Sequence, residues 1–251
     1  TSLSTTDHSQ IEEILRRLNR AFEGKGISVS VPSQRLDSFG VEMAELVAGG
    51  KRGGLTFAPE AGTQRLRDVI NKNVTEDDLL HSVRTAFEQG WKAVKLYFMM
   101  GLPTETDEDI VGIAEIAQKV VDCYKEVKGK RGVKVTVSVS CFVPKAYTPF
   151  QWFAQVPQEE FERRQRLLKE SIRDRAISFH YHDARASVLE GALSRGDRRL
   201  SAVIETAWRN GAKFDGWTDQ FKDEVWKDAF CRCGVAPEFY SRRTRDLEEV
   251  L

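Results

Sequence analysis

The chain has 251 residues, of which 41% are hydrophobic and 30% are charged, a balance typical of a folded globular protein that excludes disordered and collagen-like classes. Its 38 Lys and Arg residues equal its 38 Asp and Glu residues, so no excess of positive charge is present to attract nucleic acid or an anionic membrane. No apolar run approaches the roughly 20 residues of a membrane-spanning helix, and the four cysteines lie in a long chain without a secretory leader, so we expect a cytoplasmic protein.

Strand and helix patterns alternate through the first 150 or so residues. Stretches rich in β-branched and apolar residues predict four strands, at 27–31, 55–58, 92–99 and 133–141. Apolar residues at helical spacing predict helices around them, at 11–22, at 41–48, after Thr75 and after Thr106. Strands that alternate with capped helices are typical of βαβ units with right-handed crossovers, so we expect an α/β fold with a parallel sheet.

The predicted strands have one apolar face and one polar face. In the stretch 133–141 a valine at every second position alternates with lysine, threonine and serine, and the stretch 27–31 alternates in the same way. Strands of a sheet covered on both faces are instead continuous apolar runs. The pattern therefore favours a curved sheet whose convex face packs under helices and whose concave face lines a polar cavity, as in a partial parallel (β/α) barrel. An exposed sheet edge is the alternative explanation.

The sequence changes character after Trp152. A strongly charged helix is followed by a short strand candidate at 177–181, and the remainder is helical and rich in aromatic residues. Four of these predict one helix that packs by its rings, namely Trp217, Phe221, Trp226 and Phe230. We therefore expect two domains, a partial barrel at 1–152 and a mainly helical extension at 153–251 that closes or flanks it.

Candidate functional residues lie in the loops after the strands, because parallel α/β barrels carry their functional side chains at the carboxyl ends of the strands. Glu60 stands directly after one strand, between a rigid proline and Gly62, which would let the backbone approach a ligand. Its carboxylate could bind a hydroxyl group, act as a general base, or favour the N-terminus of a helix. Gly101 follows the strand at 92–99 and would let a ligand approach the backbone closely. Lys145 lies in the loop after the strand at 133–141, which two prolines stiffen.

One of these loops resembles a family signature. Residues 100–110, Met-Gly-Leu-Pro-Thr-Glu-Thr-Asp-Glu-Asp-Ile, are similar to the fifth-strand segment of radical S-adenosylmethionine (radical SAM) enzymes, in which a Gly-x-Pro-x-Glu-Thr run opens the fifth helix. Three other stretches follow strands in the order that this family requires, at 31–39, 58–62 and 142–150. The resemblance extends from about Thr1 to Trp152. With residues 196–208, it points to uncharacterised members whose full-length chains carry a cobalamin-binding-like N-terminal domain.

The resemblance implies a TIM-like partial barrel with S-adenosylmethionine and a 4Fe–4S cluster as cofactors. It also implies one-electron cleavage of the sulfonium, which yields a 5′-deoxyadenosyl radical that starts chemistry on an unknown substrate. The implied cofactor-binding positions are Ser4, Thr5, Arg35, Glu60, Gly62, Lys95, Tyr97, Gly101, Leu102, Phe142 and Val143. Glu60 would reach the ribose or the methionyl group, and Gly101 would lie against the adenine. The catalytic residue stays unknown, and no metal ligand is assigned.

The chain departs from the family at the iron–sulfur cluster. The family ligates the cluster with a C-x3-C-x2-C triplet after the first strand, and the four cysteines form no such triplet, since Cys231 and Cys233 have the wrong spacing and place. We therefore expect the cluster ligands upstream of Thr1, in further domains of the same polypeptide that could include a cobalamin-binding one. Without cluster thiolates the reductive cleavage cannot occur, so the fragment alone is expected to be inactive. The full-length enzyme would take electrons from a donor such as a flavodoxin or a ferredoxin.

Two other functions stay open from the residues alone. A barrel lyase or aldolase would use a desolvated Lys95 as a Schiff base and Glu60 as a proton shuttle. A non-catalytic interaction module would instead dock another domain through its aromatic C-terminal helices.

Two further patterns suggest ligands but have simpler explanations. His180 and His182 would share one face of a strand, which suits a metal ion, but without a third ligand a structural role is favoured. The arginine pairs at 163–164, 198–199 and 242–243 are typical of solvated helix faces, although a nucleic-acid substrate is conceivable.

Overall fold

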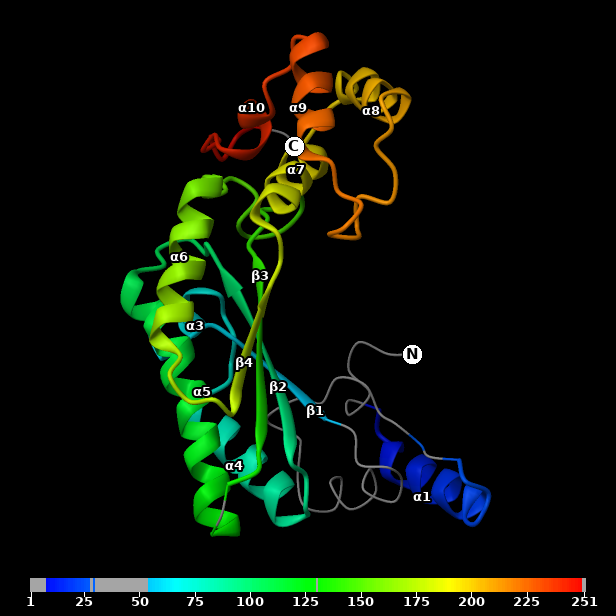
Figure 1. Ribbon diagram of the computed structural model, residues 1–251, viewed down its shortest axis with the longest axis vertical. Helices are drawn as coiled ribbons and strands as arrows, with labels where there is room; N and C mark the ends of the chain where they lie inside the picture. Colours follow the sequence, from blue (N-terminus) through cyan, green and yellow to red (C-terminus); the bar gives the residue numbers. More distant parts are fainter. Residues whose placement is uncertain (1–7, 28, 30–53, 130, 250–251) are drawn as a thin grey trace. The chain divides into compact units, whose positions relative to one another are not determined.

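The computed structural model describes residues 8–27, 29, 54–129 and 131–249 (Figure 1). Most of the strand expected at 27–31 and all of the helix expected at 41–48 lie outside the described residues, as do the predicted site residues Ser4, Thr5 and Arg35. The helices of the described part are α1 Ile11–Phe22, α3 Gln64–Val69, α4 Glu76–Glu88, α5 Asp107–Lys128, α6 Gln158–Ser171, α7 Ala184–Ser194, α8 Leu200–Arg209, α9 Asp223–Arg232 and α10 Pro237–Ser241.

Four strands form one sheet in the order β1–β2–β3–β4, with bounds Leu55–Glu60, Ala93–Met100, Lys134–Cys141 and Ile177–Tyr181. β1 and β2 run parallel, with Leu55 opposite Val94 and Phe57 opposite Leu96. At least one helix separates each strand from the next along the chain. The predicted α/β class with a parallel sheet is therefore confirmed, and α7 to α10 confirm the helical C-terminal region.

The chain divides into two compact units. Unit 1 consists of Thr1–Phe98, Thr106–Val139 and Leu167–His180, and unit 2 of Met99–Glu105, Ser140–Arg166 and Tyr181–Leu251. The chain thus passes from one unit to the other near the carboxyl ends of β2, β3 and β4. The expected domains, 1–152 and 153–251, stay a prediction.

Strands β1, β2 and β3 each bury one of their faces. Leu96 is fully buried, whereas its neighbours Lys95 and Tyr97 on the other face of β2 stay partly accessible, and β3 alternates in the same way. Helices α4 and α5 cover the buried face (Figure 1), and their Phe87 and Tyr124 rings meet edge to face with centroids 5.1 Å apart. The predicted apolar and polar faces are therefore confirmed. Burial of each large apolar side chain stabilises this layer by about 1.5–3 kcal/mol.

The helices of unit 1 begin where the capping residues predict. Thr75 and Asp78 form a reciprocal capping box, in which the Asp78 carboxylate accepts from the Thr75 N–H at 2.8 Å and the Thr75 hydroxyl accepts from the Asp78 N–H at 3.1 Å. Thr106 and Asp109 form the corresponding box of α5, which ends at Gly129 in the left-handed conformation with φ 63°. The helix starts expected after Thr75 and Thr106 are therefore confirmed.

The helices of unit 2 share an apolar core made of Val203 and Ala207 of α8, Trp226 and Phe230 of α9, and Tyr240 of α10. The prediction of one aromatic helix from Trp217 to Phe230 is wrong at its beginning, because α9 starts only at Asp223.

The reason for that late start lies in residues 214–217. Phe214 adopts a left-handed conformation with φ 59°, and Asp215 and Gly216 are weak helix formers, so the chain turns here instead of coiling. Trp217 consequently lies in a loop and is 62% exposed.

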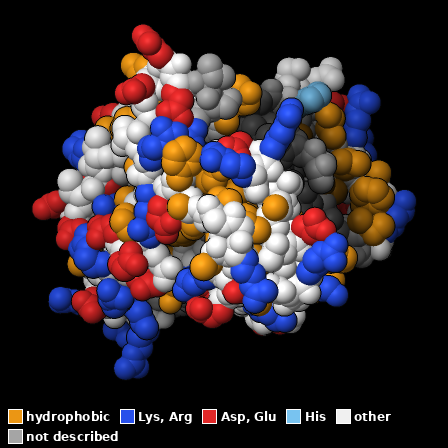
Figure 2. All heavy atoms as spheres, turned by 90° about the horizontal axis from the view of Figure 1, so that it is seen from above, with side chains coloured by type: hydrophobic (Ala, Val, Ile, Leu, Met, Phe, Trp, Pro, Cys, Tyr) orange, Lys and Arg blue, Asp and Glu red, His pale blue; other side chains and the backbone are white. Residues whose placement is uncertain are grey.

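The surface of the described part carries charges of both signs. On the face drawn in Figure 2, Lys and Arg side chains are interspersed with Asp and Glu. Each predicted arginine pair has at least one member in an ion pair, as in Arg163–Glu160, Arg199–Asp197 and Arg243–Glu249. Arg164 departs from the expected solvated helix face, because its side chain is only 11% exposed and binds the buried Glu105. No helix among the described residues combines the length and hydrophobicity of a membrane span.

Candidate functional site

Glu60 ends β1 in a strained backbone conformation. Its φ is 69°, in the left-handed region that residues other than glycine seldom adopt, and the pairing of β1 with β2 shifts register between Phe57 and Glu60. Burial raises the pKa of the Glu60 carboxyl, and Lys72, whose Nζ lies 3.5 Å from Oε1, opposes that rise. Backbone strain and a raised carboxyl pKa at a strand end are both typical of functional sites.

The loop after Glu60 packs directly on helix α5. A Cβ atom at Gly62 would collide with the carbonyl oxygen of Asp109, and one at Gly112 would lie 2.7 Å from the carbonyl oxygen of Gly62. The two glycines therefore let two backbone segments meet. The sequence suggested that Gly62 admits a ligand, whereas the close approach seen in the structure is made by α5.

Asp109 ties the same loop to the first turn of α5. Its buried carboxylate accepts hydrogen bonds from the Thr106 N–H at 2.8 Å and the Thr106 hydroxyl at 3.0 Å. The Thr63 hydroxyl and the Arg65 guanidinium donate two further short hydrogen bonds. Burial alone would raise the pKa of Asp109, but these donors outweigh it and hold the pKa below its ordinary value. Asp109 is thus a structural carboxylate.

Arg67 holds the loop that follows Glu60 through a hydrogen bond to its backbone. The residue is only 2% exposed, and its Nη1 donates to the carbonyl oxygen of Ala61 at 3.0 Å. Gln64 accepts a second hydrogen bond from Nη2 at 3.1 Å, and burial lowers the pKa of the guanidinium. A buried guanidinium bonded to a loop carbonyl fixes the backbone beside Glu60.

Lys95 and Tyr97 form a pair on the polar face of β2. The Lys95 Nζ donates to the Tyr97 hydroxyl at 2.7 Å and lies 4.4 Å from the centre of the Tyr97 ring. No hydrogen bond or ion pair joins Glu60 to either residue in the described part of the chain. Lys95 is only half-buried, whereas a Schiff-base lysine needs a desolvated amine. The aldolase alternative therefore gains no support.

In unit 2, Gly101 opens the turn that carries the family-like motif. Its φ is 89°, and a Cβ atom there would lie 2.5 Å from Cε1 of Phe161, so only glycine fits. Its N–H donates to Oε2 of Glu105 at 2.6 Å, and Arg164 binds the same buried carboxylate oxygen. Leu102 is buried within this turn. The motif glutamate thus closes the turn on its own backbone.

Phe142 follows β3 and uses both of its backbone groups within unit 2. Its N–H donates to the carbonyl oxygen of Met100 at 2.7 Å, and its carbonyl oxygen accepts from Gln155 Nε2 at 3.2 Å. Gln155 is buried and also donates to the carbonyl oxygen of Ser187 at 2.9 Å. Phe142 and Val143 are the two residues after β3 that were expected to contact the cofactor through their backbone. The N–H of Phe142 is already bonded within the chain, and Val143 is half-buried.

The structure thus places the predicted residues in two groups, with Glu60, Gly62, Lys95 and Tyr97 in unit 1 and Gly101, Leu102, Phe142 and Val143 in unit 2. Sequence reasoning did not assign the supporting role of the residues that hold these positions in place, namely Arg67, Lys72, Asp109, Gln155 and Arg164. Only Asp109 carried a sequence signal, its place in a capping box. Arg67, Lys72, Gln155 and Arg164 form no recognisable motif with their partners, so no sequence pattern indicates these contacts.

The cysteines do not fit an iron–sulfur cluster. Cys123 and Cys141 are buried, and burial raises the pKa of the Cys141 thiol to about 11. Cys233 contacts the Thr206 hydroxyl at 3.6 Å. The described residues contain no group of three or more His, Cys, Asp or Glu side chains placed to hold a metal ion, and this includes His180 and His182. No step of cluster chemistry can therefore be derived from this chain.

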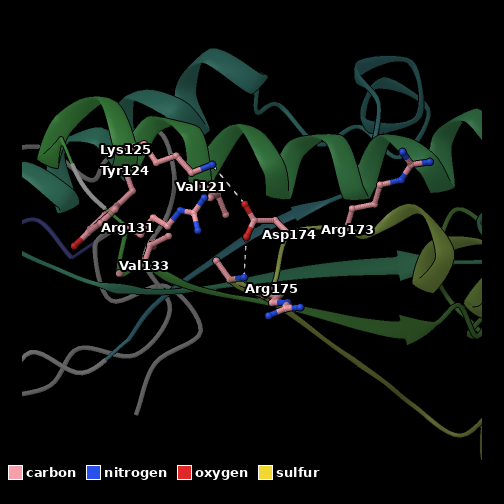
Figure 3. Close-up of a pocket in the computed structure, with 10 residues that line it drawn as sticks. Val121, Tyr124, Lys125, Arg131, Val133, Arg173, Asp174 and Arg175 are labelled. Carbon is pink, nitrogen blue, oxygen red and sulfur yellow. Dashed lines mark hydrogen bonds and ion pairs between the residues drawn. The ribbon is translucent and has the colours of Figure 1, made fainter.

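A pocket of about 420 Å³ lies in unit 1 at the amino ends of β3 and β4 (Figure 3). Asp174 in its wall accepts from the Ala176 N–H at 2.9 Å and pairs with Lys125 at 3.5 Å. The Ala176 N–H is the main cause of a lowered pKa of Asp174, and Lys125 adds to it. Because parallel barrels use the opposite, carboxyl ends of their strands, this pocket is not assigned to the candidate site.

Comparison with known proteins adds two findings. Residues 1–117 match the family model of the radical SAM superfamily. The chain is also 30% identical, over 239 residues, to an uncharacterised protein of Methanocaldococcus jannaschii, and the match covers 90% of this chain and 49% of that relative. The chain therefore spans about half the length of the curated relative that it matches.

Proposed function

We propose that this chain, whose residues 1–117 match the family model of the radical SAM superfamily, is the S-adenosylmethionine-binding part of a longer radical SAM enzyme. The observation that carries the proposal is Glu60, a carboxylate with a strained backbone and a raised pKa at the end of β1. In the family, this strand end faces the cofactor, and a carboxylate there can accept hydrogen bonds from ribose hydroxyls or from the methionyl ammonium group.

The other proposed cofactor contacts are those that the resemblance implies, namely Ser4, Thr5, Arg35, Gly62, Lys95, Tyr97, Gly101, Leu102, Phe142 and Val143. Lys95 and Tyr97 have a specific role in this proposal. Their mutual hydrogen bond keeps an ammonium group on the polar face of the sheet, where it can bind the carboxylate of the cofactor or of a substrate.

In the longer protein, bound S-adenosylmethionine and a reduced cluster would supply one-electron cleavage of the sulfonium, and this chain would contribute binding, orientation and exclusion of water. Because the four cysteines do not fit a cluster, we assign the cluster ligands to the remainder of a longer polypeptide. The substrate, a cobalamin cofactor, a flavodoxin or ferredoxin as electron donor and a cytoplasmic location are further parts of the proposal for that longer protein.

Isothermal titration of the 251-residue chain with S-adenosylmethionine tests the binding proposal. We expect saturable binding, and Glu60→Gln should weaken it by about 10- to 100-fold, because one hydrogen bond to a charged acceptor contributes about 1.5–3 kcal/mol. Glu115→Gln changes an exposed carboxylate on α5 and should leave the affinity unchanged. Absence of binding, or equal affinity of the Glu60→Gln variant, would contradict the proposal.

The enzymatic part of the proposal needs the longer protein. We expect anaerobically purified protein that extends upstream of Thr1 to contain about four irons per chain and to form 5′-deoxyadenosine under reduction. An iron-free extended protein would refute the radical SAM activity, even if the shorter chain binds S-adenosylmethionine.

A further inference from the structure

A second pocket, of about 660 Å³, lies in unit 2 between α7 and the loop that precedes α9. This volume is within the range of small-molecule sites. Its described lining residues are Tyr181, His182, Asp183, Ala186, Ser187, Leu189, Glu190, Leu193, Ser194, Asp215, Gly216, Thr218 and Phe221. They include three carboxylates and neither lysine nor arginine.

Two of the three carboxylates are neutralised by cations from outside the lining. Asp183 pairs with Arg185, with 2.6 Å between Oδ2 and Nη2, and Glu190 pairs with Lys145. The third, Asp215, has no side-chain hydrogen bond or ion pair with any described residue, and its Oδ1 atom is buried. A buried carboxylate oxygen without a donor is costly. The pocket therefore holds one carboxylate that no described cation or hydrogen-bond donor satisfies.

Other groups of the wall also suit a cation. The hydroxyl oxygen of Ser194 is a second buried polar atom that finds no hydrogen-bond partner among the described residues. Two aromatic rings, Tyr181 and Phe221, line the pocket, and the guanidinium of Arg185 already lies 6.0 Å from the centre of the Phe221 ring. A carboxylate combined with aromatic rings is a typical recognition set for an ammonium group.

The loop that carries Asp215 is held in a strained form. Phe214 has φ 59°, an outlier for a bulky residue, and its ring stacks on Trp217 with centroids 5.3 Å apart and an angle of 13° between planes. Both rings are mostly exposed, at 67% and 62%. Strain of this kind persists where a loop clamps a ligand.

We propose that this pocket binds a small organic molecule that carries a protonated amine. The ammonium group donates to the free oxygen of Asp215, the Ser194 hydroxyl provides a further hydrogen-bond partner, and the apolar body of the ligand lies against Phe221. The site stands on the contacts of unit 2 alone, so it does not depend on S-adenosylmethionine binding or on radical chemistry.

Saturation-transfer NMR titrations of the whole chain with three matched probes test this site at pH 7. The probes are benzylamine, which is protonated, benzyl alcohol, which is neutral, and benzoate, which is an anion. We expect benzylamine to bind about tenfold more tightly than benzyl alcohol, and benzoate not to bind. This comparison uses the unmodified protein, so it does not depend on the folding of any variant.

Asp215→Asn keeps the shape of the side chain and removes its charge, so it should abolish the preference for benzylamine. Asp219→Asn is the matched control, because Asp219 is exposed in the same loop and does not line the pocket. Equal binding of the amine and the alcohol, no binding of the amine, or an unchanged preference in Asp215→Asn would each overturn the proposal.

Discussion

The carboxylate of Glu105 accepts a hydrogen bond from the backbone N–H of Gly101, with 2.6 Å between Oε2 and N. The Glu105 side chain is 1% exposed, and Arg164, 59 residues further along the chain, binds the same carboxylate. In the Gly-x-Pro-x-Glu run, the buried carboxylate of the last residue therefore binds the backbone N–H of the first, and this hydrogen bond closes the turn.

Replacing that carboxylate should cost much stability. Glu105→Ala removes a buried ion pair and a hydrogen bond and leaves Arg164 partly uncompensated, so we expect a loss of about 3 kcal/mol in the free energy of unfolding. Urea unfolding measures it. Glu159→Ala is the control, because that carboxylate is 78% exposed and 4.0 Å from Arg242, and it should change stability by no more than about 0.5 kcal/mol. Equal losses in both variants would argue against the buried turn.

Asp109 should make stability depend on pH under acidic conditions. Its pKa is lower in the folded chain than the ordinary 3.8, so its stabilising effect is fully present above the unfolded value and is lost as pH falls through the folded value. We expect Asp109→Ala to cost about 3 kcal/mol at pH 7 and less than that near pH 3. Parallel urea titrations at both values, with exposed Asp77→Asn as the control, measure the difference. A cost that is the same at both values would contradict the pairing.

Gly62 should not tolerate a side chain. The added methyl group of Gly62→Ala would meet the backbone of α5, which cannot rotate away, so we expect a loss of about 1–3 kcal/mol in the free energy of unfolding. Gly54→Ala offers a matched control at the other end of the same strand, since its Cβ would make an ordinary contact with Ala93 at 3.6 Å. A neutral Gly62→Ala variant would show that the loop and α5 are further apart than described.

The ionised carboxylate of Glu60 should lower the stability of the fold while it strengthens ligand binding. Because burial raises its pKa in the folded chain, ionised Glu60 destabilises the fold at pH values above the folded pKa, and the penalty disappears below the ordinary value of 4.5. Glu60→Gln should therefore raise the melting temperature slightly at pH 7, although it weakens S-adenosylmethionine binding. For the unmodified chain, that binding should weaken as pH falls towards the ordinary value of 4.5, because protonation removes the carboxylate. A less stable Glu60→Gln variant would contradict this account.

Local patterns predicted much of the fold. The alternating valines of β3 correctly indicated a sheet with two different faces, and Thr75 and Thr106 marked helix starts because a capping box is completed within four residues. The same local reading failed at Trp217, whose helical spacing to Trp226 could not reveal the left-handed turn at Phe214.

The site was less predictable because its supporting contacts are distant in sequence. Glu60 was singled out from its place after a strand, but its pairing with Lys72 depends on the path of α3 and the loop that follows. Asp215 was missed entirely. An aspartate in a loop is usually solvated, and only the folded structure shows one of its oxygens buried without a donor.

The contact between Gly62 and Gly112 also constrains how this chain can evolve. Each glycine faces main-chain atoms of the other segment, and main-chain atoms are the same whatever residue stands there. Between two packed side chains, a larger residue at one position can be compensated by a smaller one at the other. No such compensation is possible here, because both glycines face main-chain atoms. Homologous proteins that keep this loop on this helix should have glycine at both positions, and the two should change only together with the loop itself.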